Sequence, residues 1–493
     1  MATRLIELVE NLPAARVVLV GDFMLDKYIF GSTSRVSPEA PIPVLRYQRE
    51  EFRLGGAGFV MAALGALGAK VNCVGVIGAD SAGVELKSRL TEAGADVDGL
   101  VIAPDRPTVA KTRLLGSSED RSPQQMIRLD VEQTQPVTGT VADEIIARAT
   151  AAIANADVLC LEDYDKGVLA PAVCAKLIEV ARSKGIPIFV DPARLNDYSK
   201  YTGATVLKLN RPEAERATSI RIKDAEDYSV IATRLLGSLA LEAVVMTLNE
   251  KGSFLATRDG ESQLLSSRPR QVADATGAGD TVLATLCIAR AAGASWADAV
   301  ALGNVAAGLE VERLGCVPIK PAEIVHDLMM EHYEQDGKER TLAALLPELQ
   351  RLRDSGRKIV FTNGCFDLIH LGHVKYFQFA KSQGDILVVG VNTDDSIRRL
   401  KGPKRPVVNE LDRVGVLEEL ESIDYLIRFD DDTPEKLIHA IKPDVLVKGE
   451  DYNKSQVVGA DFVESCGGRV ALAPLVNGRS TSSVIQKILE AYK

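Results

Sequence analysis

The stretch Asp274-Ala-Thr-Gly-Ala-Gly-Asp280 decides the fold of the first two thirds of this 493-residue chain, and a helix-forming segment, 281–286, follows it. Two glycines let the backbone turn so that several N–H groups point outward at a helix N-terminus, where the helix dipole adds positive potential. The stretch therefore predicts an anion site. Asp280 is placed to act as a base if the anion is a transferring phosphoryl group, although the motif alone fits a helix N-cap equally well.

Short apolar, β-branched runs alternate with helix-length segments before this motif. The pattern predicts a parallel sheet covered on both faces, and hence an α/β fold. The predicted strands are 16–20, 71–77, 157–161, 186–190, 205–209 and 243–248. Half-polar stretches at 42–49, 108–114 and 125–129 break this rhythm and predict a small exposed sheet, a lid, appended to the main one.

Three further segments of the first part carry polar or glycine residues at predicted strand or helix ends. Asp22 and Asp26 follow the first strand, where carboxylates can bind sugar hydroxyls. Gly55 and Gly56 open the next helix, but the third glycine of a dinucleotide-binding fingerprint is absent, so we set that alternative aside. Asn210 and Glu213 follow another strand and could hold a hydrated metal or nucleotide phosphates, although an Asn there is often a simple turn former.

A second module begins after a charged linker at 331–340. From residue 341 onward the chain has 21 basic and 22 acidic residues, against 37 and 46 before it, so nearly all of the net charge of −10 lies in the first part. We therefore predict a domain at 1–330 and a second α/β domain at 341–493. The predicted strands of the second domain are 358–361, 385–391, 425–429, 444–447 and 469–473.

The second module carries two of the five histidines of the chain, His370 and His373, after its first strand. Paired imidazoles at a helix N-terminus can stabilise the negative charge of a pentacoordinate phosphate and its leaving group. A zinc site would use Cys365 with both histidines, but no fourth ligand is spaced nearby. A plain structural role for both histidines is the remaining alternative.

Basic and hydroxyl residues later in the module fit the same chemistry. The loop 398–405 holds five positive charges in eight residues, which predicts a triphosphate clamp rather than an ordinary solvated loop. The segment 478–483 supplies Arg479, Ser480, Thr481 and Ser482 before a helix, which is also the pattern of an ordinary helix cap.

Composition excludes several classes of protein. With 46% apolar and 26% charged residues the chain is a globular enzyme rather than a fibrous or disordered protein. The negative net charge makes nucleic acid an unexpected partner, and no apolar run is long enough for a membrane span. Seven scattered cysteines without a C-x-x-C pair indicate reduced thiols, so we expect a cytoplasmic protein.

Taken in order, the motifs of residues 1 to about 330 resemble the ribokinase-like carbohydrate kinase family. The resemblance implies a doubly wound sheet with a small β lid, and Asp280 as the base that deprotonates a sugar hydroxyl. The amides of Ala278 and Gly279 would hold charge on the γ-phosphoryl group, and Asn210 and Glu213 would help to place Mg²⁺ with ATP without a fixed metal site. The remaining expected contacts are Asp22, Asp26, Gly55, Gly56, Lys111, Arg113 and Arg128 for the sugar phosphate, and Thr247, Gly252 and Gly277 for the nucleotide.

Two departures from the pattern of this family concern the nucleotide side. The usual Thr-Pro-Asn is Lys208-Leu209-Asn210 here, and Asn249 stands where the nucleotide loop usually has Gly. Because Asn tolerates the left-handed conformation, we expect the loop to keep its shape.

Residues 341–493 resemble the nucleotidyltransferases typified by glycerol-phosphate cytidylyltransferases, which implies a Rossmann-like domain. The resemblance implies attack by a sugar phosphate on the α-phosphate of a nucleoside triphosphate, with His370 and His373 as catalytic residues. The expected nucleotide contacts are Thr362, Asn363, Gly364, Phe366, Lys401, Arg405, Lys448, Arg479, Ser480, Thr481 and Ser482.

The order of the two modules and the segments 21–28, 34–41, 191–192, 275–281 and 447–452 resemble one family of fused enzymes. Its members pair a heptose 7-phosphate kinase with a heptose 1-phosphate adenylyltransferase in the synthesis of ADP-heptose for lipopolysaccharide. Glu450 departs from the Gly of related sequences. The resemblance implies heptose phosphates and ATP as partners and a homodimer formed through the lid. The alternatives are another sugar kinase fused to a cytidylyltransferase, and a catalytically silent sensor of sugar phosphates.

Overall fold

The computed structural model describes residues 2–117, 123–313, 315–450, 457–474 and 490. The chain divides into two compact units, Met1–Met329 and Met330–Lys493. None of the helices in these ranges combines the length and the apolar character that crossing a bilayer requires. All seven cysteines are free thiols, as their scattered spacing predicts.

The first unit is built on a nine-stranded sheet in the order β13-β12-β11-β10-β9-β8-β1-β4-β5. The β11–β12 and β12–β13 pairs are antiparallel and all other pairs are parallel, so β12 alone runs against the other strands. The chain winds outward in both directions from β1, so the carboxyl ends of β1, β8, β9 and β10 form the crevice where such sheets bind ligands. The strands are β1 (Arg16–Gly21), β4 (Lys70–Ile77), β5 (Leu100–Ile102), β8 (Val158–Glu162), β9 (Ile188–Asp191), β10 (Val206–Asn210), β11 (Ala243–Thr247), β12 (Ser253–Thr257) and β13 (Ser262–Leu265).

Helices cover both faces of this sheet, which confirms the predicted doubly wound fold. One core joins the sheet to α1 (Ala2–Glu10), α2 (Ala57–Ala66), α3 (Ser81–Glu92), α8 (Ala278–Ala291), α9 (Trp296–Glu310) and α10 (Pro321–Asp336). The other joins it to α4 (Gly139–Ile153), α5 (Pro171–Ser183), α6 (Arg211–Thr218) and α7 (Glu226–Ser238). Two 3₁₀ turns, η1 (Ser199–Tyr201) and η2 (Asn249–Lys251), complete this unit.

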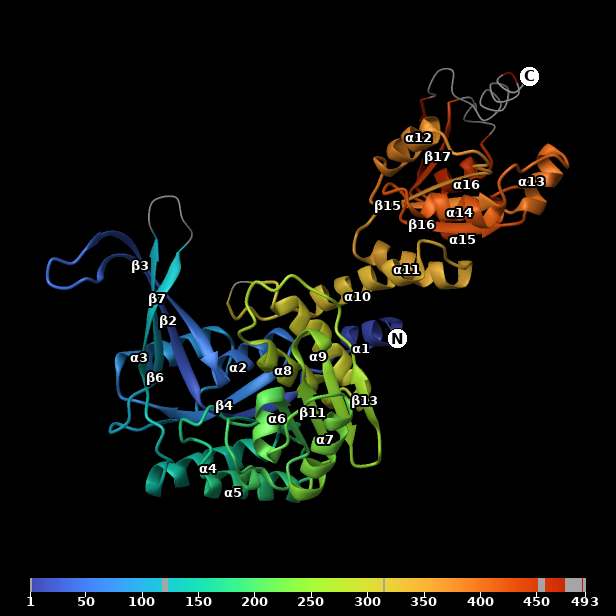
Figure 1. Cartoon of the computed structure of the whole chain (residues 1–493). Helices are drawn as coiled ribbons and strands as arrows, with labels where there is room; N and C mark the ends of the chain where they lie inside the picture. Colours follow the sequence, from blue (N-terminus) through green and yellow to red (C-terminus); the bar gives the residue numbers. More distant parts are fainter. Residues whose placement is uncertain (1, 118–122, 314, 451–456, 475–489, 491–493) are drawn as a thin grey trace. The chain divides into compact units, whose positions relative to one another are not determined.

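The predicted lid is a separate four-stranded sheet in the order β3-β2-β6-β7. Its strands stand out from the body of the first unit as an arm (Figure 1). They are β2 (Phe23–Val36), β3 (Pro43–Gly56), β6 (Val109–Ser117) and β7 (Gln124–Val131). Because β2 begins one residue after Asp22, Asp26 lies on a lid strand.

The second unit is a five-stranded parallel sheet in the order β16-β15-β14-β17-β18, which confirms the Rossmann-like prediction. The strands are β14 (Ile359–Gly364), β15 (Ile386–Asn392), β16 (Tyr425–Phe429), β17 (Val445–Gly449) and β18 (Arg469–Ala473). One core packs α11 (Leu342–Asp354), α15 (Glu435–Ile441) and α16 (Ala460–Ser465) against the sheet, and the other packs α12 (Leu371–Lys381) and α14 (Glu410–Glu418). Helix α13 (Asp394–Lys401) follows β15.

The segment 331–340, which we predicted to be a charged linker, is partly structured. Helix α10 continues to Asp336. Beyond it, the chain hydrogen-bonds to edge strand β16: the N–H of Arg340 donates to the carbonyl of Leu426, and the N–H of Leu426 donates to that of Lys338. Residues 338–340 therefore belong to the second unit because they extend the edge of its sheet.

Candidate active sites

Asp280 lies in the first turn of α8, at the crevice of the first sheet. The N-cap is Gly277, whose φ of 99° is a left-handed conformation that glycine adopts without strain. The Asp280 side chain does not cap the helix. It is 8% exposed and accepts hydrogen bonds from the hydroxyl of Tyr164, at 3.2 and 3.3 Å. The N-cap alternative for Asp280 is therefore wrong.

The surroundings of Asp280 suit a base. Burial raises the pKa of its carboxyl group to about 6, while the charge of Lys208, the Tyr164 hydroxyl and the charge of Lys111 oppose this shift. A carboxylate with a pKa near 6 accepts a proton more readily than an exposed one and is still ionised at neutral pH.

Two more carboxylates lie beside Asp280, at the ends of β8 and β9. One oxygen each of Glu162, Asp191 and Asp280 lies within 4.8 Å of the others, and all three residues are buried. Lys208 on β10 is 4% exposed and forms an ion pair with Asp191. The three carboxylates are therefore already served by one buried ammonium group.

The lid brings basic side chains to the same crevice. Arg113 on β6 pairs with Asp26 on β2 at 2.8 Å. The Lys111 ammonium lies 5.4 Å from the centre of the Tyr164 ring, and burial lowers the pKa of Lys111. Arg128 lies opposite Arg113 in the β6–β7 register, but its guanidinium is held by Asp130.

Asp22 and the glycine pair shape the floor of this crevice. The Asp22 carboxylate is 1% exposed and accepts hydrogen bonds from the N–H groups of Tyr164, Lys166 and Val168. It therefore fixes the turn after β8, which carries Tyr164. Gly55 and Gly56 end β3 and pair with Met24 and Phe23 of β2.

Asn210 and Glu213 form a reciprocal capping box at the start of α6. The Asn210 side-chain amide donates to Glu213 Oε1 at 2.7 Å, and the Asn210 N–H donates to Oε2 at 2.8 Å. Asn210 therefore has a local capping role, and Arg194 lies 3.6 Å from the Glu213 carboxylate. Thr247 ends β11, and Gly252 follows the turn in which Asn249 has a φ of 54°, as expected from the sequence.

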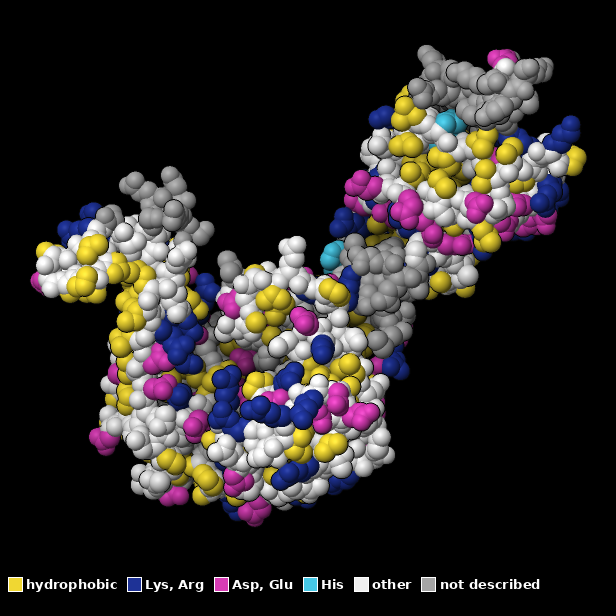
Figure 2. Space-filling view, viewed as in Figure 1, with side chains coloured by type: hydrophobic (Ala, Val, Ile, Leu, Met, Phe, Trp, Pro, Cys, Tyr) yellow, Lys and Arg dark blue, Asp and Glu magenta, His cyan; other side chains and the backbone are white. Residues whose placement is uncertain are grey.

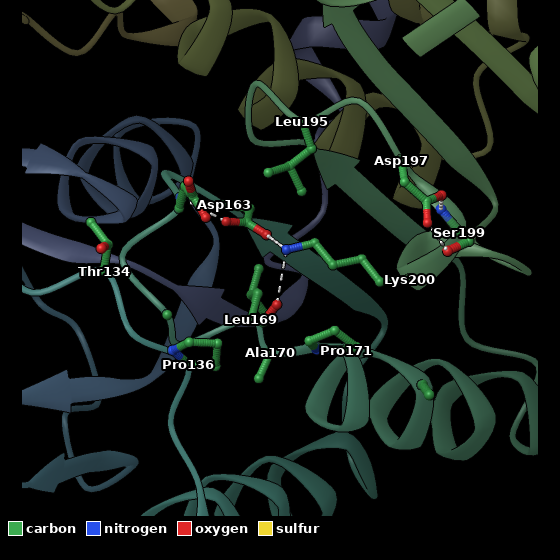
Figure 3. Close-up of a pocket in the computed structure, with 13 residues that line it drawn as sticks. Thr134, Pro136, Asp163, Leu169, Ala170, Pro171, Leu195, Asp197, Ser199 and Lys200 are labelled. Carbon is green, nitrogen blue, oxygen red and sulfur yellow. Dashed lines mark hydrogen bonds and ion pairs between the residues drawn. The ribbon is translucent and has the colours of Figure 1, made fainter.

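A cavity of about 480 Å³ lies at the same end of the sheet, after β8 and β9. Figure 3 shows Asp163 and Lys200 pointing toward each other at this cavity. Their ion pair measures 2.5 Å, and the Lys200 ammonium also donates to the Leu169 carbonyl. This pair holds η1 to the turn after β8.

In the second unit, His370 and His373 lie side by side at the start of α12. Their rings stack with centroids 4.0 Å apart. His370 is the N-cap and its Nδ1 accepts a hydrogen bond from the Gly372 N–H, so only His373 lies within the helix. Burial, the neighbouring His370 and Lys401 lower the pKa of His373 to about 4.

The other predicted nucleotide residues of this unit at 362–366 and 448 lie close to the histidine pair or are held by hydrogen bonds. Thr362 is buried, with its hydroxyl against Tyr376 and the Val447 carbonyl. Lys448 donates to the Asn363 side chain. Phe366 packs edge-on to His373. Gly364 ends β14 beside these residues, and the Glu450 N–H donates to the Ala473 carbonyl.

The basic segment 398–405, predicted as a loop, begins inside α13, which ends at Lys401, and more of its charges are paired than its sequence suggests. Arg398, Arg399 and Arg405 pair with aspartates, the last with Asp367. Lys401 is exposed and close enough to His373 to lower its pKa. Arg479, Ser480, Thr481 and Ser482 lie outside the described residues.

Comparison with known proteins agrees with this two-site geometry. Residues 14–323 match the pfkB family of carbohydrate kinases, and residues 361–473 match the cytidylyltransferase-like family. The bifunctional protein HldE of Geobacter metallireducens is 46% identical over 475 residues, covering 96% of each chain. That of Citrifermentans bemidjiense is 45% identical and covers 98% of each.

The chain belongs to the family of bifunctional HldE proteins. Solved structures agree with the fold of its kinase unit. Arabidopsis thaliana ribokinase, complexed with ribose and ATP, is 22% identical with a TM-score of 0.52, and covers 64% of this chain and 99% of its own. Escherichia coli phosphofructokinase-2 is 19% identical with a TM-score of 0.53, with the same coverage.

The sequence motifs assign no role to four residues that the structure brings to the Asp280 crevice: Tyr164, Lys208, Glu162 and Asp191. Glu162 and Asp191 end adjacent strands, and Tyr164 follows two residues after Glu162. The carboxyl ends of neighbouring parallel strands meet at one edge, so charged residues there were a usable signal.

Proposed function

We propose that the kinase unit of this HldE protein transfers the γ-phosphoryl group of ATP to the anomeric hydroxyl of heptose 7-phosphate, giving the 1,7-bisphosphate. The second unit joins heptose 1-phosphate to the AMP part of ATP, giving ADP-heptose, a lipopolysaccharide precursor, and pyrophosphate. The observation that carries this conclusion is the full-length match to bifunctional HldE proteins. It favours this pair of activities over a different sugar kinase fused to a cytidylyltransferase.

In the kinase reaction, Asp280 takes the proton of the anomeric hydroxyl. The oxygen forms a bond to the γ-phosphorus as the bond to the bridging oxygen of ADP breaks. The backbone N–H groups of Ala278 and Gly279 at the start of α8 stabilise the charge that develops on the transferred group. The buried position of Asp280 supports this role because few water molecules can reach its carboxylate and protonate it in place of the sugar hydroxyl.

The residues present fit Mg²⁺ held with ATP rather than in a protein cage. Each Glu213 oxygen accepts one hydrogen bond from Asn210 in the capping box, and a carboxylate oxygen can accept a second one from a water of a hydrated ion. Mg²⁺ keeps several waters and binds through one or two carboxylates and the substrate phosphates. When bound, it would neutralise charge on the β- and γ-phosphates.

The 7-phosphate of the sugar needs cationic partners, and the lid supplies them. Lys111 and Arg113 are two residues apart on β6 and therefore face the same side of the lid sheet. The contact of Lys111 with Tyr164, which binds Asp280, puts that side toward the reacting centre. We assign Lys111 and Arg113, with Arg128 beside them, to the recognition of this phosphate.

In the adenylyl transfer, an oxygen of heptose 1-phosphate attacks the α-phosphorus of ATP and pyrophosphate leaves. The stacked imidazoles of His370 and His373 and the ammonium of Lys401 would bind the phosphate oxygens as charge builds on them. No covalent enzyme intermediate is needed because the sugar phosphate itself offers an anionic oxygen that can attack the α-phosphorus.

Two further proposals concern the oligomeric state of the protein and its location in the cell. Apolar side chains lie along the outer edge of the lid (Figure 2), and Ile127, Leu129 and Val131 alternate on β7 with 58%, 61% and 43% exposure. We propose that they form a homodimer interface between lids. The reduced cysteines and the requirement for ATP support action in the cytoplasm.

Product analysis tests the two activities directly. The full chain would be incubated with ATP and heptose 7-phosphate, and separately with ATP and heptose 1-phosphate. Mass spectrometry and phosphorus NMR should find the bisphosphate with ADP in the first and ADP-heptose with pyrophosphate in the second. Preference for CTP in the second incubation would favour the cytidylyltransferase alternative, and absence of turnover in both would favour a sensor.

A further inference from the structure

Lys208 is a buried lysine in the middle of the catalytic crevice. It lies on β10, where Val206 packs in the core shared with α8, while Leu207 and Leu209 pack in the opposite core. Because side chains alternate along a strand, Lys208 faces α8. A Cβ atom built on Gly279 would lie 2.7 Å from the Lys208 ammonium nitrogen, so that ammonium lies against the turn that opens α8.

The ammonium of Lys208 also serves the carboxylate cluster. It pairs with Asp191, and one oxygen from each of Glu162, Asp191 and Asp280 lies within 4.8 Å of the others. Burial lowers the pKa of Lys208, but these three carboxylates outweigh it and raise the pKa above its ordinary value. Lys208 is therefore charged when the site is ready to react.

Three buried carboxylates this close would repel one another without a cation. Carboxylate oxygens are ligands that Mg²⁺ accepts, so the cluster alone would suit a metal ion. The Lys208 ammonium already lies beside this cluster, paired with Asp191. The chain thus supplies a permanent cation from its own strand.

We infer that Lys208 is a positioning residue of the kinase reaction. Its ammonium takes the place of a metal ion among the three carboxylates, keeps Asp280 ionised as the base, and supports the Gly277–Gly279 turn whose amides face the transferred phosphoryl group. The inference rests on the proposed role of Asp280. It gives the departure from Thr-Pro-Asn a function, since a Thr at position 208 would carry no charge.

Other groups also face Asp280 and contribute to its ionisation. Tyr164 donates a hydrogen bond to it, and Lys111 favours its charged form, while Asp26 opposes it. The remaining ionisable neighbours are Glu162, Asp191, Glu310 and Cys316. Lys208 is the largest of the influences that favour the ionised form of Asp280, which makes it the residue to change.

The test compares Lys208→Met with Lys208→Arg in the full chain. ADP formation from ATP and heptose 7-phosphate is followed against pH, and a thermal melt of each sample shows that its kinase unit is folded. In Lys208→Met we expect the acid limb of kcat/KM to move up by about 1 pH unit and kcat to fall, with the KM for heptose 7-phosphate little changed. Lys208→Arg should keep the wild-type limb because it keeps the charge.

Lys200→Met is the matched control. Lys200 also forms a buried ion pair, with Asp163, at the same end of the sheet, with side chains 12% and 2% exposed (Figure 3). Its loss should lower the melting temperature without moving the acid limb. If Lys208→Met is too unstable to assay, Lys208→Arg decides: a wild-type limb with a reduced kcat supports the inference.

A wild-type acid limb and kcat in Lys208→Met would overturn the role of Lys208, as would a shifted limb in Lys208→Arg. Asp280→Asn separates this failure from failure of the proposed function. If Asp280→Asn still phosphorylates the sugar, the proposed base is wrong. If it is inactive while Lys208→Met matches wild type, only the inference on Lys208 fails.

Discussion

The hydroxyl of Tyr164 donates to the Asp280 carboxylate, at 3.2 Å from one oxygen and 3.3 Å from the other. Burial and the neighbouring Asp280 charge raise the pKa of Tyr164 well above its ordinary value, so the phenol keeps its proton. Asp22 in turn binds the Tyr164 N–H at 2.9 Å. Asp22, at the end of the first strand, thus holds Tyr164, and Tyr164 orients the proposed base Asp280.

Replacing Tyr164 with Phe should weaken catalysis without abolishing it. The change removes a hydrogen bond that favours the ionised form of Asp280, so the pKa of Asp280 should rise by about 1 unit. The acid limb of the kinase pH profile should move upward by the same amount. An unshifted limb would mean that Tyr164 does not contact the ionised base during turnover.

Asp280→Asn should abolish phosphorylation of heptose 7-phosphate and leave adenylyl transfer intact. Loss of a general base costs about 100-fold or more. In the wild-type enzyme, kcat/KM of the kinase reaction should fall as the pH drops through about 6. Burial raises the pKa of Asp280 to about 6, and below that pH its carboxylate is protonated and cannot act as a base. Loss of both activities in a folded variant would contradict two independent sites.

The fold was predictable because buried parallel strands are nearly continuous apolar runs. The run 16–20 became β1 (Arg16–Gly21), and 425–429 became β16 without change. The extent of the lid was not predictable in the same way. Strand β2 follows Asp22 directly and is half polar, so nothing in its local pattern separates a long exposed strand from a loop.

The candidate site was predictable where one segment carries the chemistry, as in the Gly277–Asp280 turn and the histidine pair. It was not predictable where partners come from distant strands. From the sequence alone, Lys208 is a charged residue with no predicted partner, and only the β9–β10 pairing brings it beside Asp191. Likewise, the charge of Arg405 suggests a phosphate ligand until the fold pairs it with Asp367.

Arg113→Ala should reduce discrimination between heptose 7-phosphate and unphosphorylated heptose. A charge-assisted hydrogen bond to phosphate is worth about 2 kcal/mol, or roughly 30-fold in kcat/KM. The same change leaves Asp26 without its ion-pair partner, so Arg113→Lys serves as a control that keeps a charge. Unchanged discrimination in the Ala variant would remove Arg113 from the phosphate site.

Leu129→Glu should convert a dimer into monomers if the lids associate. Leu129 is 61% exposed in the middle of the apolar row on β7, and a buried carboxylate without a partner is costly at such an interface. Light scattering with size-exclusion chromatography measures the mass of each species. Val84→Glu, at a residue of α3 that is 74% exposed, is the control. A dimer that survives Leu129→Glu would place the interface elsewhere.

His373→Ala should abolish adenylyl transfer and leave the kinase reaction intact. His373 has a pKa of about 4 in the free protein, because burial, His370 and Lys401 all disfavour its charged form. It is therefore neutral when the nucleotide arrives, and kcat/KM should stay level as the pH falls through the usual histidine range near 6.5. A decline there that disappears in His373→Gln would show instead that His373 of the free protein takes up its proton in the usual histidine range and that its protonated form does not support the reaction.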